Sequence, residues 1–88
     1  MPYTIEFHNA ALRNLANLSK KECSRIIEAI EQLAPDPLHA PNVKRLKEYD
    51  VSYRMRVGNF RVLFDRDDSI QIISIVDVRD RKSAYKRK

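Results

Sequence analysis

Residues 53–64 alternate bulky apolar side chains with polar or charged ones in two short runs. The runs are Tyr53 to Val57 and Phe60 to Phe64, joined by Gly58-Asn59. Alternation with a period of two predicts strands, and a two-residue loop that contains glycine predicts a β-hairpin. Gly58 is the only glycine in the chain, and such a loop needs positive φ at one or both central positions, which glycine adopts freely.

The polar face of this hairpin is predicted to carry three arginines. With a two-residue loop, Arg56 lies directly opposite Arg61, and Arg54 lies two residues away on the same face. Like charges opposite each other destabilise a sheet by up to about 1 kcal/mol per pair. Two explanations stay open: the arginines pair with carboxylates elsewhere in the fold, or they form a surface that binds anions such as phosphate.

The N-terminal half of the chain predicts one strand followed by two helices. Pro2 to His8 alternates as a half-buried strand, and Asn9 can cap a helix of about ten residues. Ser19 precedes Glu22 by three residues, the spacing of a capping box, immediately before an apolar stripe at helical spacing. Pro35 ends this second helix.

The C-terminal half predicts further strands. Pro35 to Pro41 is expected to be an extended connector, and Asn42 to Asp50 a basic loop or edge strand. Asp65 to Asp68 indicates a turn, Ser69 to Asp77 a strand rich in isoleucine, and Val78 to Lys88 a basic segment that forms a short helix from Asp80.

The expected fold class is α+β, in one domain that spans residues 1–88. A small, antiparallel-rich, four-stranded sheet carries two N-terminal helices packed on one face and a short basic C-terminal helix. The first strand is expected at one edge or parallel to the last strand. The other face of the sheet stays open, and it carries the arginines.

Charge divides the chain into two unequal halves. Residues 1–43 carry four Lys or Arg against five Asp or Glu, whereas residues 44–88 carry thirteen against seven. The half that contains most of the sheet is therefore the basic one. This asymmetry indicates that nucleic acid, or another polyanion, approaches the sheet and the C-terminus.

Several classes of chemistry are excluded by what the sequence lacks. The single cysteine, Cys23, allows no internal disulfide or cysteine-based zinc site, and its place in an apolar stripe predicts burial. His8 and His39 are isolated and are expected on the surface. No Cys or His cluster has the spacing of metal ligands, and one glycine allows no Gly-rich nucleotide loop, so neither metal nor cofactor is expected. The absence of an apolar run of about 20 residues, or of a signal peptide, predicts a cytoplasmic protein.

The hairpin YRMRVGNFRVLF and the ending VRDRKSAY resemble the RelE/ParE superfamily of bacterial and archaeal toxins. The family pattern is Y-R-x-R-V-G-x-[YF]-R-V, followed by a terminal H-R-K-x-x-Y, and the resemblance covers essentially the whole chain. It implies a RelE-like fold. In the RelE branch, toxins cleave messenger RNA in the ribosomal A site without metal, by attack of a 2′-OH on the adjacent phosphate. The ParE branch poisons DNA gyrase.

The resemblance also implies which residues form the site. The implied catalytic residues are Arg54, Arg56, Arg61 and Tyr85, with Arg79 or Arg81 as the arginine ahead of the terminal helix, of which Arg81 is the expected catalytic one. By their charge, the basic residues Lys44, Arg45, Lys47, Arg79 and Lys82 are expected to bind RNA. Lys44, Arg45 and Lys47 could equally be a solvated edge. Where some relatives have lysines, this chain has Arg54 and Arg56, which cannot act as bases. Asp80 replaces a histidine found in many members, so the proton acceptor stays open between Tyr85, whose phenolate nearby cations favour, and Asp80.

The expected function is that of a type II toxin, a ribosome-dependent, metal-independent endoribonuclease of the mRNA interferase class that inhibits translation. Its expected partners are a cognate antitoxin and messenger RNA on the ribosome, with operator DNA contacted only through the antitoxin complex and no membrane. Two alternatives stay open. One is a ParE-like inhibitor of DNA gyrase, and the other is a noncatalytic nucleic-acid-binding corepressor that acts with its antitoxin.

Overall fold

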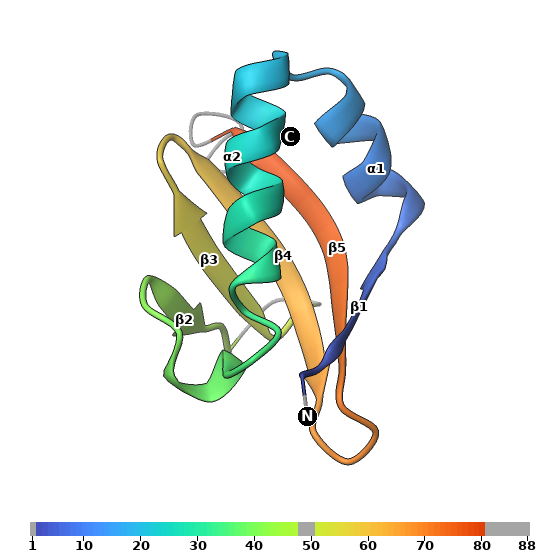
Figure 1. The fold of residues 1–88 in the computed structure, drawn as a ribbon, viewed down its shortest axis with the longest axis vertical. Coiled ribbons are helices and arrows are strands. Elements are labelled where there is room, and N and C mark those ends of the chain that lie inside the picture. Colours follow the sequence, from blue (N-terminus) through green and yellow to red (C-terminus); the bar gives the residue numbers. More distant parts are fainter. Residues whose placement is uncertain (1, 48–50, 81–88) are drawn as a thin grey trace.

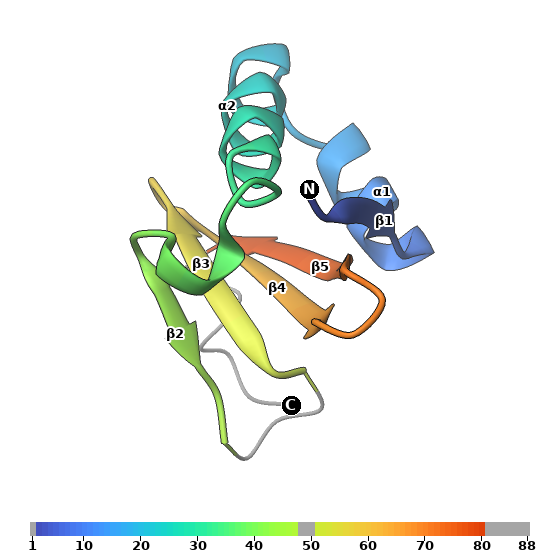
Figure 2. The ribbon, with the colours of Figure 1, turned by 60° about the horizontal axis from the view of Figure 1, so that its bottom comes forward.

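A computed structural model of the chain describes residues 2–47 and 51–80. It forms one mixed sheet with two helices on one face (Figures 1 and 2). In chain order the elements are β1 (Thr4–Phe7), α1 (Asn9–Ala16), α2 (Lys20–Glu31), a 3-10 helix (Pro37–His39), β2 (Val43–Arg45), β3 (Tyr53–Val57), β4 (Phe60–Asp67) and β5 (Ile72–Asp80). Neither helix among these residues is long and apolar enough to cross a membrane.

The strand order is β1-β5-β4-β3-β2. β1 lies at one edge and pairs in parallel with β5, while the other neighbouring strands are antiparallel. The α+β class and the place of the first strand are therefore confirmed. The predicted strand count of four was too low by one, because the basic segment 42–50 contributes the short edge strand β2.

The helices follow the predicted signals with small shifts. The Ser19 side chain accepts a hydrogen bond from the Glu22 N–H (3.1 Å), which confirms the predicted N-terminus of α2. In α1 the N-cap position is His8 rather than Asn9, and the helix has eight residues. Segment 35–41 was predicted as extended, but Pro37–His39 forms a 3-10 helix, for which proline at the first position is suited.

The β3–β4 hairpin has the predicted register, with Val57 opposite Phe60 and Arg56 opposite Arg61. Gly58 has φ of 58°, whereas Asn59 is not among the described residues with positive φ. Positive φ in a two-residue loop is typical of the primed turns, whose twist matches the right-handed twist of the strands. The hairpin turn therefore needs glycine at position 58.

Strand β4 is longer than predicted, because it runs through the segment 65–67 that was predicted as part of a turn. The turn follows it. The Asp67 carboxylate accepts hydrogen bonds from the Ser69 hydroxyl (2.7 Å), the Ser69 N–H (3.0 Å) and the Ile70 N–H (3.4 Å). These hydrogen bonds lower the pKa of Asp67 below its ordinary value.

Strand β5 continues past its predicted end and contains a β-bulge. Leu63 pairs with Asp77 but Phe64 pairs with Ile75, so Val76 is an extra residue on β5. The bulge reverses the alternation, since Ile73 and Ile75 are buried before it and Val78 is buried after it. Residues 78–80 therefore belong to the strand, and the predicted C-terminal helix falls on 81–88, outside the described residues.

The core lies between the helices and one face of the sheet. Its buried side chains come from α1 and the α2 segment (Ala11, Leu15, Ile26, Ile30, Leu33) and from the strands (Met55, Val62, Phe64, Ile73, Ile75, Val78). Phe64 is fully buried at its centre. Cys23 is only half-buried, so the predicted burial of this side chain was wrong.

A chain of paired side chains closes the end of the sheet that carries the β4–β5 turn. Tyr53 stacks on Phe64 with ring centroids 5.4 Å apart. The Arg66 guanidinium lies 4.7 Å from the centroid of Tyr53, and its Nε lies 2.7 Å from an oxygen of Asp68. The Tyr3 hydroxyl donates a hydrogen bond to Asp68 (2.9 Å). This arrangement ties β1 to the hairpin.

Candidate functional site

Three arginines form a row across the middle of the sheet. Arg56 on β3 lies opposite Arg61 on β4, and Arg61 lies opposite Arg79 on β5. We call Arg56, Arg61 and Arg79 the arginine row. Neighbouring strands lie about 4.8 Å apart, so the row presents three guanidiniums at the spacing of adjacent strands. The sequence predicted the first pair, and the structure adds Arg79 to it.

A second pair of cations lies beside the arginine row. Arg54 on β3 is half-buried and lies opposite the exposed Lys44 of β2. Both point away from the helices, because Met55 and Val43, their neighbours along each strand, pack on the core side. We call Lys44, Arg54 and the arginine row together the basic face. It is the face of the sheet that the helices leave open (Figure 2).

The β-bulge at Val76 is what brings Arg79 to the basic face. Without the extra residue, Arg79 would share the side of Ile73 and Ile75, which face the core. Asp77 then holds the arginine, because its carboxylate accepts from the Arg79 Nε (2.8 Å) and from the Asn14 amide of α1 (2.5 Å). Helix α1 thereby fixes one end of the row.

Asp77 was missed by the sequence interpretation as a functional residue. One signal was present, since aspartate and arginine two residues apart on a strand point to the same side. The contribution of Asn14 had no such signal, because 63 residues separate it from Asp77 in the chain.

The cations of the basic face differ in how they are neutralised. Arg79 is paired with Asp77. Among the residues that the structure describes, no carboxylate lies within ion-pair distance of Arg54, Arg56 or Lys44. The first explanation for the cluster, pairing with carboxylates elsewhere, is therefore not found for these three side chains. Their N–H groups are directed to the open side of the sheet, where they could bind an anion.

The other predicted site residues are distributed differently. Arg45 lies opposite Tyr53, on the helix side of the sheet, and Lys47 is exposed beyond the end of β2. Asp80 pairs with Phe60, so alternation along β5 directs it away from the side that carries Arg79. The predicted residues Arg81, Lys82 and Tyr85 lie outside the described residues.

The histidines behave as predicted for surface residues. His8 is exposed at the start of α1, and His39 is exposed with its Nδ1 3.0 Å from Asp36. Within residues 2–47 and 51–80, no group of three His, Cys, Asp or Glu side chains could hold a metal ion. The chemistry that the basic face offers is electrostatic: fixed guanidiniums that can bind phosphate oxygens and stabilise negative charge on them.

Comparison with known protein families gives one match over most of the chain. A family model described as the ParE toxin of the type II toxin–antitoxin system parDE matches residues 5–85. The matched range includes every residue of the basic face.

Two curated relatives are similar over nearly their whole length. The chain is 34% identical over 88 residues to the RelE1 protein of Methanocaldococcus jannaschii, with 98% of each chain covered. It is 31% identical over 88 residues to toxin RelG of Mycobacterium tuberculosis, with 99% of this chain and 100% of the relative covered.

Two solved structures share the fold and are complexes. The toxin–antitoxin complex RelBE2 of Mycobacterium tuberculosis contains a chain with a TM-score of 0.77 and 28% identity, over 92% of this chain and 100% of that one. The archaeal RelE–RelB complex of Pyrococcus horikoshii gives a TM-score of 0.79 and 25% identity, over 92% and 97%.

Proposed function

This chain belongs to the RelE/ParE family of toxins of type II toxin–antitoxin systems, and from that premise we propose that it is an endoribonuclease that cleaves messenger RNA on the ribosome. The observation that carries the proposal is the arginine row, together with Arg54. A sheet face that held like charges only for solubility would lose stability by placing arginines opposite one another. Binding of a phosphodiester would compensate that repulsion.

The proposed reaction is a transesterification at phosphorus. The 2′-oxygen of one nucleotide attacks the adjacent phosphate, its proton passes to a base, and the 5′-oxygen of the next nucleotide leaves with a proton. Negative charge grows on the non-bridging oxygens in the transition state. Arg56 and Arg61, one on each strand of the hairpin, are proposed to stabilise that charge, while Arg54 and Lys44 bind a neighbouring phosphate.

The base in this reaction is proposed to be Tyr85. Arginine side chains stay protonated in proteins, so neither the arginine row nor Arg54 supplies a proton acceptor. The direction of Asp80, away from the side of Arg79, favours Tyr85 between the two candidates. Tyr85→Phe removes the hydroxyl and keeps the ring, so we expect single-turnover cleavage on programmed ribosomes to slow by about 10² or more. Full activity of this variant would exclude Tyr85 as the base.

The test of the activity is cleavage of a defined message on purified, programmed ribosomes. Arg61→Ala removes one preorganised donor, which is worth about 10² to 10³ in rate. Arg13→Ala removes the same charge from the exposed surface of α1 and serves as the matched control. We expect the control to cleave as the unchanged chain does. Equal rates for all three proteins would contradict a catalytic role for the arginine row.

A cognate antitoxin is the proposed protein partner. The solved relatives named above are toxin–antitoxin complexes, and the unneutralised cations here favour an acidic segment. We propose that the antitoxin carries such a segment, disordered until it binds over the basic face. Expression of the chain alone, at high yield and without harm to the host, would contradict this.

Inhibition of DNA gyrase is the second candidate, because the family model that matches the chain is described as ParE. The two functions differ in a simple assay. A gyrase inhibitor would block supercoiling of relaxed plasmid by purified gyrase. This inhibition involves no 2′-OH attack, so Arg61→Ala would not be expected to abolish it in the way that it should abolish RNA cleavage. We expect no inhibition of supercoiling.

A further inference from the structure

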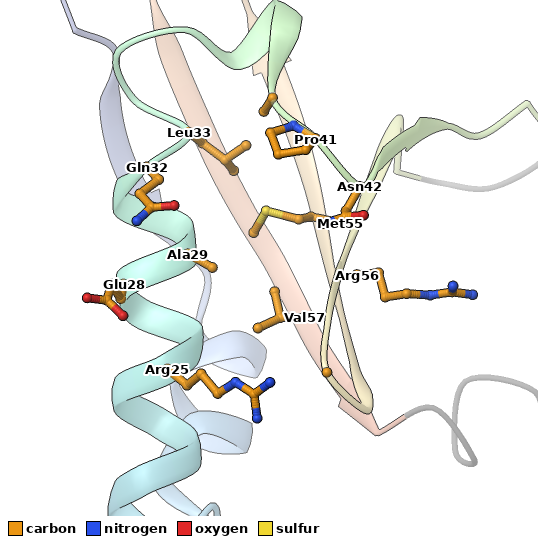
Figure 3. Close-up of a pocket in the computed structure, with 12 residues that line it drawn as sticks. Arg25, Glu28, Ala29, Gln32, Leu33, Pro41, Asn42, Met55, Arg56 and Val57 are labelled. Carbon is orange, nitrogen blue, oxygen red and sulfur yellow. The ribbon is translucent and has the colours of Figure 1, made fainter.

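A groove of about 320 Å³ runs between α2 and the hairpin, and Arg25 lies at one end of it. Its floor is apolar, formed by Ala29 and Leu33 of the α2 side and by Met55 and Val57 of β3. Figure 3 shows Arg25 extending from α2 toward the hairpin turn, whereas Glu28 points away from the groove. The groove therefore leads from the core side of the hairpin to its tip.

The Arg25 guanidinium lies beside the turn with its flat face toward Gly58. A Cβ built on Gly58 would lie 3.5 Å from each of Cζ, Nη1 and Nη2 of Arg25. Equal distances to three atoms of the planar group mean that its face, rather than its edge, covers the glycine. The N–H groups, which lie in that plane, are consequently directed outward from the contact.

These N–H groups have no acceptor among the described residues. Glu22 and Glu28 lie three residues away on either side along α2, a spacing that allows ion pairs on a helix. Glu22 instead accepts from the capping Ser19 hydroxyl (3.2 Å), and neither carboxylate comes within ion-pair distance of Arg25. The exposed Arg25 guanidinium therefore lies beside the hairpin turn with its hydrogen-bonding capacity unused among the described residues.

The position of Arg25 extends the basic face around the tip of the hairpin. Only Val57 separates Arg56 from this turn, and only Phe60 separates the turn from Arg61. The N-terminal half of α2, the hairpin turn and the C-terminal end of β5 all lie at the same end of the molecule (Figure 1). A polyanion bound along the arginine row would reach Arg25 by passing over this turn.

We propose that Arg25 binds a phosphate of an RNA backbone that crosses the hairpin tip, next to the nucleotide bound at the arginine row. The inference rests on the proposed function for the identity of the polyanion as RNA. The position of the guanidinium favours this role, because its N–H groups are exposed beside the hairpin tip and a planar guanidinium matches the geometry of a phosphate. The phosphate could belong to the message or to ribosomal RNA, and the chemistry of the contact is the same.

The test measures binding rather than cleavage. A labelled single-stranded RNA with 2′-O-methyl groups cannot react by 2′-OH attack, so its dissociation constant can be followed across salt concentrations from about 50 mM to about 250 mM. We expect Arg25→Ala to bind about tenfold more weakly at the lowest salt, and to reduce the slope of log K against log salt by about 0.7, the value for one phosphate contact on a single strand. Vacant ribosomes form the second arm.

Matched variants distinguish a phosphate contact made by Arg25 from an effect of net charge and from an effect on folding. Arg13→Ala lowers the net charge equally and should leave both the affinity and the slope close to those of the unchanged chain. Arg25→Lys keeps the charge and should restore the slope. A loss with the oligonucleotide assigns the phosphate to the message, and a loss only with ribosomes assigns it to ribosomal RNA.

Two results would overturn the inference. If Arg25→Ala matches Arg13→Ala in both arms while the unchanged chain binds, Arg25 makes no phosphate contact and the proposed function still stands. The same conclusion follows if Arg25→Lys binds as weakly as Arg25→Ala, because a positive charge at this position would then contribute nothing to binding. If the unchanged chain binds neither probe, the proposed function fails as well.

Discussion

Arg66 and Arg56 belong to the same hairpin, yet their surroundings differ in every respect that matters for function. Arg66, near the β4–β5 turn, stacks over Tyr53 and pairs with Asp68, and its side chain is 13% exposed. Arg56, near the other end, is exposed and lies opposite Arg61, with no carboxylate within ion-pair distance among the described residues. The fold neutralises Arg66, which holds strands together, and leaves Arg54 and Arg56 on the basic face without a carboxylate within ion-pair distance among the described residues. That difference indicates a ligand.

The largest effect should come from replacing Arg56 by a carboxylate side chain, so that an arginine of the basic face faces an acidic residue as Arg66 does. Arg56→Glu places a carboxylate directly opposite Arg61 and replaces a like-charge pair with an ion pair. We expect ribosomal cleavage to fall by at least about 10² to 10³, because a donor is lost and a second is neutralised. The free energy of unfolding should stay the same or rise by up to about 1 kcal/mol.

Chemical denaturation and cleavage assays on the same preparation check this prediction. A large loss of stability in Arg56→Glu would mean that the basic face is structural after all. Arg56→Gln, which removes the charge without adding a carboxylate, is the matched control and should lose activity with little change in stability.

Arg66→Ala should have the opposite effect, lowering stability while leaving cleavage unchanged. This change removes the cation–π contact with Tyr53 and the ion pair with Asp68, and should lower the free energy of unfolding by about 1 to 2 kcal/mol. Cleavage per folded molecule should be unaffected, since Arg66 lies on the core side of the sheet with Tyr53. Urea denaturation measures the first quantity. If Arg66→Ala lost as much cleavage activity as Arg56→Gln does, the proposed difference in function between Arg66 and Arg56 would be contradicted.

A smaller effect is expected at the hairpin tip. Gly58→Ala forces an L side chain to adopt φ of 58°, a left-handed conformation that costs alanine roughly 1 kcal/mol. The added Cβ would lie 3.5 Å from the Arg25 guanidinium, an ordinary contact. The cost therefore comes from the backbone, and Gly58→Asn, which tolerates this conformation better, should be less destabilised in the same denaturation experiment.

The smallest effect concerns how stability depends on pH through Asp67, which lies beside the β4–β5 turn. Hydrogen bonds from Ser69 and Ile70 lower the pKa of Asp67, so the folded state holds this carboxylate deprotonated more firmly than the unfolded state does. Its stabilising contribution is complete above the ordinary aspartate pKa of about 3.9 and is lost as pH falls through the lower, folded value. In Asp67→Asn, Tm should decline less steeply than in the unchanged chain between about pH 5 and about pH 3. Parallel curves would contradict this.

Local patterns were enough to predict the hairpin, its register and the start of α2. Gly58, the alternation around it and the Ser19 cap each act through neighbours in sequence, so the pattern of residues determines the local structure. Arg54, Arg56 and Arg61 were placed correctly for the same reason, whereas Arg66, predicted in a turn, lies within β4.

The features that the sequence did not predict depended on contacts between residues that are far apart in the chain. The bulge at Val76 is set by packing on both sides of β5, and it alone decides which face Arg79 occupies. Val43–Arg45 forms a strand by pairing with the edge of β3, a contact between separate parts of the chain. Arg25 lies on the polar side of its helix, where nothing in the sequence connects it to Gly58.

Primer extension on translated messages after brief induction tests the central claim, that the basic face is where RNA is cleaved. We expect new 5′ ends at discrete positions within translated regions when the unchanged chain is induced, and none when Arg56→Glu is induced to the same folded level. New ends of equal abundance with Arg56→Glu would contradict it, and so would growth arrest by the unchanged chain without any new ends.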